Sequence, residues 1–113
     1  MIIGSSGVDF SPDQISEEMS KRGKAWAELD GAYRALDDAT KSVLSNIASR
    51  MDGSEAAKDR EARGHKEYRE HLEYLATART AALVAKVNYD VWKMWIDMKR
   101  SEISYTKAQM NIL

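Results

Sequence analysis

The sequence predicts an all-α protein, an antiparallel and coiled-coil-like hairpin of two long helices that assembles further into a helical-bundle oligomer. Charged residues make up 31% of the 113 residues and hydrophobic residues 43%, with one proline and six glycines, a composition that favours helices over strands. Two long segments carry apolar residues at three- and four-residue spacing. A charged segment without large apolar side chains separates them. One hairpin domain over residues 11–113 accounts for all three features.

The first helix is expected over residues 12–51. Ser11 is a suitable N-cap, Pro12 suits the first helical position, and Gln14 stands where a capping box has its second partner. No further proline or capping signal follows before residues 52–54, so one continuous helix of roughly 60 Å is predicted. Residues 1–10 lack the basic leader and apolar run of a signal peptide, and we expect them to form a flexible arm.

Apolar residues of the first helix form a heptad seam, in which Arg22 and Thr40 stand at the two polar steps. Gly23 and Gly31 weaken the helix slightly and are expected to lie off this seam. The predicted hairpin core therefore receives from the first helix Ile15, Met19, Trp26, Leu29, Tyr33, Leu36, Val43 and Ile47.

Residues 53–64 are the predicted connector, because they are charged and too small to pack deeply even where they are helical. The second helix is expected over residues 65–108, with one apolar face at helical spacing. This face adds to the hairpin core Leu72, Leu75, Ala78, Ala82, Tyr89, Trp92 and Ile96. Tyr68, Ala85 and Ile103 extend the same face.

Antiparallel pairing around the connector predicts which side chains meet in the core. The bulky residues between Trp26 and Leu36 would face the alanine-rich residues 76–85. Large side chains would then interdigitate with small ones, as close packing requires. Trp92 and its neighbours would in turn face the start of the first helix, including Arg22. This agreement favours a hairpin over two unrelated helices.

The second helix also carries a second apolar stripe on a different face. A single hairpin covers only one face of each helix, and an exposed apolar patch of this size usually marks an interface. We therefore predict self-association through Val84, Val87, Val91, Met94 and Met98.

The balance of charge identifies no particular partner. There are 17 basic and 18 acidic residues, interleaved along the chain, so neither a polyanion nor an anionic membrane is indicated. The most apolar window, residues 81–98, contains too many charges for a membrane span. The absence of cysteine removes disulfides and thiolate metal sites. We expect a cytoplasmic protein without membrane contact.

No motif in the sequence indicates catalysis, and we expect neither an enzyme nor a cofactor. Glu67 and His71 could share a helix face as metal ligands, but His65 and His71 are six residues apart and do not fit a zinc-peptidase helix. They are interpreted as solvated residues at a helix start. Nucleophile elbows, phosphate loops and dinucleotide fingerprints are absent from the sequence. The function that this leaves is contact with another molecule, without catalysis.

Nucleic-acid binding is an alternative that the C-terminal half suggests, since cations there are interspersed with aromatic rings such as Trp92, Trp95 and Tyr105. Nearby carboxylates offset the cations, so this interpretation ranks below protein–protein contact. The candidate nucleic-acid contacts are Lys93, Lys99, Arg100 and Lys107.

Residues 71–81, with residues 86–89 and 96–100, resemble small alanine-rich helical proteins encoded by bacteriophages and prophages. Residues 26–30 and 33–38 match more loosely. The resemblance implies a phage-type accessory protein in the host cytoplasm, with no functional residues to transfer. Its expected function is non-enzymatic contact with a host or phage protein, as an oligomer. The alternatives are a recombination or replication accessory that associates with nucleic acid, and an inhibitor of a host protein.

Overall fold

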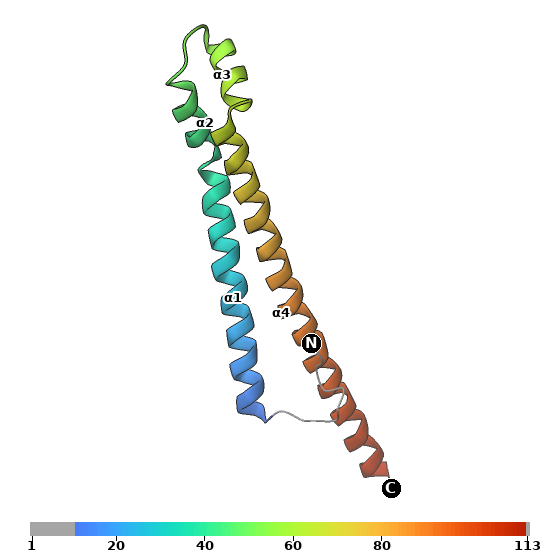
Figure 1. The fold of residues 1–113 in the computed structure, drawn as a ribbon. Helices are drawn as coiled ribbons and strands as arrows, with labels where there is room; N and C mark the ends of the chain where they lie inside the picture. Colours follow the sequence, from blue (N-terminus) through green and yellow to red (C-terminus); the bar gives the residue numbers. More distant parts are fainter. Residues whose placement is uncertain (1–10, 113) are drawn as a thin grey trace. The chain divides into compact units, whose positions relative to one another are not determined.

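A computed structural model describes residues 11–112, and within this range the chain forms helices and no strands (Figure 1). The helices are α1 (Pro12–Asp38), α2 (Thr40–Ala48), α3 (Glu55–Arg63) and α4 (Lys66–Ile112). The predicted all-α class is confirmed. The expected arm, residues 1–10, lies outside the described residues.

The chain divides into two compact units, and both α1 and α4 contribute to each of them. Unit 1 contains the chain up to Trp26 together with the chain from Val84 onward, and unit 2 contains Ala27–Leu83. Arg22 contacts Trp92 and Trp26 contacts Tyr89 in unit 1, and Thr40 contacts His71 and Arg50 contacts Glu67 in unit 2, so the residue numbers on α4 fall as those on the preceding helices rise. The helices within each unit are therefore antiparallel, as the hairpin prediction requires.

The start of α1 is the predicted capping box. The backbone N–H of Gln14 donates to Ser11 Oγ at 3.2 Å, and the backbone N–H of Ser11 donates to Gln14 Oε1 at 2.8 Å. Pro12, which has no N–H to satisfy, occupies the first helical position. These reciprocal bonds fix where α1 begins.

The interior of unit 1 is built from aromatic rings. Trp92 and Ile96 of α4 are buried, and the guanidinium of Arg22 lies 4.9 Å from the centre of the Trp92 ring. Trp26 meets Tyr89, with the ring centres 5.5 Å apart. Arg22 also pairs with Glu18, 2.8 Å away, so its charge is compensated. Arg22 therefore faces Trp92 across the unit, in the predicted register.

Gly23 lies at a helix contact, which corrects the expectation that it is off the seam. A Cβ atom at this position would stand 3.3 Å from Tyr89 Cε1, closer than ordinary van der Waals contact. At Gly31, by contrast, a Cβ atom would have no neighbour within 4 Å outside its own stretch of helix. Gly23 thus lets the Tyr89 ring approach the α1 backbone, whereas Gly31 has no such role.

The prediction of one continuous helix over residues 12–51 is wrong. α1 ends at Asp38, α2 begins at Thr40, and α2 ends at Ala48. The Thr40 hydroxyl donates to the backbone oxygen of Leu36 at 3.2 Å. A threonine that bonds back to the preceding turn in this way competes with the backbone ladder and often bends a helix. This hydroxyl accounts for the interruption beside Ala39.

The predicted connector is itself a helix, and one of its side chains is fully buried. Gly53 takes a positive φ of 116° in the turn after α2, and Ser54 then caps α3 by accepting a hydrogen bond from the backbone N–H of Ala57 at 3.2 Å. Ala62 of α3 has no exposed surface. The expectation that this segment cannot pack deeply is therefore wrong, because a small side chain is enough to pack closely against its neighbours.

Burial of the predicted hairpin core is uneven. Ile47, Ala82, Trp92 and Ile96 are buried. Leu29 and Leu72 are 39% and 40% exposed, so their placement in the core is corrected. The other predicted core residues are half-buried, namely Ile15, Met19, Trp26, Tyr33, Leu36, Val43, Leu75, Ala78 and Tyr89.

Candidate interaction surfaces

The stripe predicted for self-association is exposed along α4 of unit 1. Its side chains are between 46% and 64% exposed, although all are aliphatic or thioether groups. These five residues, called the apolar stripe below, are Val84, Val87, Val91, Met94 and Met98. Spacing of three and four residues along one helix places them in a single row. No described residue covers this row.

The row continues beyond the residues identified from sequence. Further steps of three and four residues from Met98 reach Ser101 and Tyr105, and the Tyr105 ring is also exposed. Gln109 donates a hydrogen bond to the Tyr105 hydroxyl at 2.9 Å, which holds the ring along α4. The unbroken seven-residue spacing could have identified Tyr105 from the sequence. The exposed row therefore extends for three heptads.

A second surface of unit 1 is an open groove of about 810 Å³ between the start of α1 and the C-terminal part of α4. We call it the end groove. Ile15, Trp95, Ile96 and Ile103 give it an apolar lining, and Lys99, Arg100 and Lys107 add three cations against the carboxylate of Glu102. Trp95 stacks on Trp92 with ring centres 5.2 Å apart. The sequence analysis missed this groove.

The candidate nucleic-acid contacts do not share one environment. Lys99, Arg100 and Lys107 line the end groove, whereas Lys93 does not. The Lys99 ammonium pairs with Glu102 at 3.3 Å and lies 5.9 Å from the centre of the Trp95 ring. Arg100 and Lys107 are exposed and form no ion pair with a described residue. Their role in nucleic-acid binding stays a prediction.

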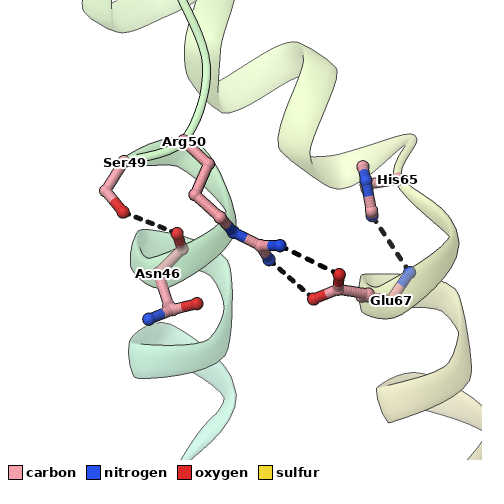
Figure 2. Close-up of polar contacts among 5 residues, drawn as sticks. All are labelled: Asn46, Ser49, Arg50, His65 and Glu67. Carbon is pink, nitrogen blue, oxygen red and sulfur yellow. Dashed lines mark hydrogen bonds and ion pairs between the residues drawn. The ribbon is translucent and has the colours of Figure 1, made fainter.

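The polar residues at the start of α4 have partners within unit 2 (Figure 2). The two guanidinium nitrogens Nη1 and Nη2 of Arg50 donate to the carboxylate of Glu67 at 3.0 and 2.6 Å. These hydrogen bonds lower the pKa of Glu67 and raise the pKa of Arg50. His65 Nδ1 accepts from the backbone N–H of Glu67 at 3.1 Å and so caps α4. Glu67 is therefore engaged in an ion pair.

His71 is buried, which overturns its interpretation as a solvated residue at a helix start. It is only 8% exposed, and its Nε2 lies 2.9 Å from Thr40 Oγ1. The single hydroxyl proton of Thr40 is given to Leu36, so Nε2 of His71 is the donor in this pair. The histidine is therefore the hydrogen-bond partner of the threonine that interrupts the helix.

No helix within residues 11–112 combines the length and the apolar character that a membrane span requires. α4 is long, with 47 residues, but charged side chains recur throughout it. In unit 1, the exposed apolar residues of α4 include the apolar stripe, which forms one row between these charges. Such a row is typical of a helix that contacts another protein segment.

The chain matches no protein-family model, and no curated protein or solved structure is significantly similar to it. The resemblance of residues 71–81 to phage proteins therefore stays a prediction. The apolar stripe and the end groove, both on unit 1, are the surfaces from which a function can be argued.

Proposed function

We propose that this chain is a non-enzymatic helical interaction protein that assembles with copies of itself through the apolar stripe of α4. The observation that carries the proposal is the exposure of all five stripe residues in a single row. Leaving such side chains in water is unfavourable by about 1.5–3 kcal/mol each compared with burying them. A matching row on a second copy would cover them by coiled-coil packing.

The predicted coiled-coil-like hairpin is part of this proposal, and the antiparallel contacts inside each unit support it. The origin is proposed on the resemblance alone: an accessory protein of a phage or prophage, active in the host cytoplasm through contact with another protein. Inhibition of one host protein is a form of the same function and would use the same kind of surface. Recovery of one stoichiometric partner from that host would support it.

Light scattering on the purified chain at micromolar concentration tests the assembly. We expect a multimer, and we expect Val91→Glu to dissociate it, because a carboxylate in the middle of the row would have to be desolvated. Ser104→Glu is the matched control, since it adds the same charge to an exposed position of α4 outside the row. Circular dichroism should show equal helix content in both variants. A monomeric wild-type chain, or a Val91→Glu multimer, would contradict the proposal.

Association with nucleic acid is a second candidate function, favoured by the exposed cations Arg100 and Lys107 beside Trp95. Such binding would weaken steeply as salt is raised, because counterions are released from the phosphates. Assembly through the apolar stripe would instead persist at high salt. Band shifts on single- and double-stranded DNA at low salt separate the two, and the absence of any shift would exclude this second function.

A further inference from the structure

The end groove exists because the face of α4 that packs on α1 extends beyond the first turn of α1. Ile96 and Ile103 are seven residues apart and thus lie on the same face of α4. Ile96 is 6% exposed, whereas Ile103 is 56% exposed although it continues the same row. The capping box at Ser11 fixes the beginning of α1 at Pro12. The described part of the chain therefore leaves an apolar helix face uncovered.

The charge of the groove is positive where it borders this uncovered face. Glu102 is neutralised by Lys99 at 3.3 Å. Arg100 and Lys107 have no such partner among the described residues, and both line the groove. Helical spacing places Lys99 on one side of Ile103 and the other two cations on the opposite side. An occupant along Ile103 would thus have cations on both flanks.

The dimensions of the groove suit a short helix. Its lining on α4 extends from Trp95 to Lys107, which corresponds to a rise of about 18 Å. An α-helix of about 12 residues covers the same length. Such a segment could pack on Ile103 in continuation of the helix-on-helix packing that α1 provides at Ile96.

We propose that the end groove binds an acidic amphipathic helix of a partner protein. Aliphatic or aromatic side chains of that helix would cover Ile103 and Trp95, and its carboxylates would pair with Arg100 and Lys107. This is the helix-in-groove mode of recognition, in which apolar anchors provide affinity and flanking charges provide specificity. The proposal goes beyond self-association because the groove and the apolar stripe lie on different faces of α4.

The lining of the groove favours a peptide over a nucleic acid. Stacking of bases needs exposed aromatic faces, but Trp95 is stacked on Trp92 and approached by Lys99. The remaining apolar surface is aliphatic, from Ile15 and Ile103. Aliphatic side chains at three- and four-residue spacing are what an amphipathic helix presents to such a surface.

Selection of a random peptide library on the immobilised full-length chain tests this inference. We expect the recovered peptides to combine apolar residues at helical spacing with an excess of Asp and Glu. One recovered peptide, labelled and titrated by fluorescence anisotropy, should bind at least about tenfold more weakly to Lys107→Glu and to Ile103→Asp. Lys93→Glu is the matched control, because it reverses an exposed charge of α4 outside the groove. It should change the affinity by less than about twofold.

Three results would overturn the proposal. The first is a set of recovered peptides without an acidic excess. The second is a single-stranded oligonucleotide that binds the chain and loses affinity in Lys107→Glu but not in Lys93→Glu, which would make nucleic acid the occupant. The third is dissociation of the multimer by Lys107→Glu, which would make a second copy the occupant. Peptide binding should persist in Val91→Glu, so failure of self-association is distinguishable from failure of this inference.

Discussion

Unit 1 packs aromatic rings around the buried Trp92 and leaves its apolar stripe exposed, whereas unit 2 buries Ile47 and alanines beside the polar pair of Thr40 and His71. In unit 1 the largest buried side chain is Trp92, which lies against the guanidinium of Arg22. In unit 2 the buried residues include Ala62 and His71, and the Arg50–Glu67 ion pair joins the end of α2 to the start of α4. The two ends of the same long helix α4 therefore have different kinds of partner.

We expect this difference to separate the recognition role proposed for unit 1 from a structural role in unit 2. Large apolar surfaces that are only partly covered provide binding energy for another molecule, which is the role proposed for unit 1. Caps and polar pairs contribute less energy but require a defined geometry, as at the turns of unit 2. We therefore expect substitutions in unit 1 to have larger effects on stability and assembly, and substitutions in unit 2 to act through satisfaction of buried polar groups.

The largest expected effect is that of Trp92→Ala in unit 1. Removing a fully buried tryptophan should lower the free energy of unfolding by about 3–5 kcal/mol, because it removes apolar contact and leaves a cavity. Urea denaturation at a fixed protein concentration measures this change. Ile47→Ala is the counterpart in unit 2. It should lower the free energy of unfolding by a smaller amount, because a smaller side chain is removed. A larger loss for Ile47→Ala would reverse the proposed contrast.

An intermediate effect is expected for Thr40→Val in unit 2. The substitution removes the acceptor for the buried donor His71 Nε2, which should lower the free energy of unfolding by about 1–3 kcal/mol. The double variant Thr40→Val, His71→Leu removes both polar partners and should recover part of the loss, as a double-mutant cycle in urea would measure. Thr77→Val, at an exposed threonine of α4, is the control. Equal losses at Thr40 and Thr77 would show that the pair contributes nothing.

The smallest effect is expected from two glycine substitutions, one in each unit. Gly31→Ala in unit 2 should raise the free energy of unfolding by about 0.5–1 kcal/mol, because alanine favours the helix and nothing obstructs its methyl group. Gly23→Ala in unit 1 should raise the free energy of unfolding by a smaller amount, because the Tyr89 ring must move away from the new methyl group. Parallel thermal and urea unfolding of the two variants measures the difference. Equal gains would mean that the ring is loosely packed.

Periodicity allowed the regular features of the fold to be predicted from the sequence. The row of α4 residues from Val84 to Met98 was recognisable because spacing of three and four residues needs no knowledge of the partner. The start of α1 was recognisable because Ser11, Pro12 and Gln14 act on their own turn. The break at Ala39 was missed, because it depends on the hydroxyl of Thr40 and no proline or glycine marks it.

The sequence by itself determined the helical class, the capped start of α1 and the exposed row on α4, since each depends on interactions between residues a few positions apart. Only the tertiary structure decided that His71 is buried, that Gly23 admits the Tyr89 ring, and that the described residues leave Ile103 uncovered. The physical reason is that these three features depend on the register between packed helices. How far one helix extends along another, and which side chains meet there, depends on packing between distant segments, which local propensity does not specify.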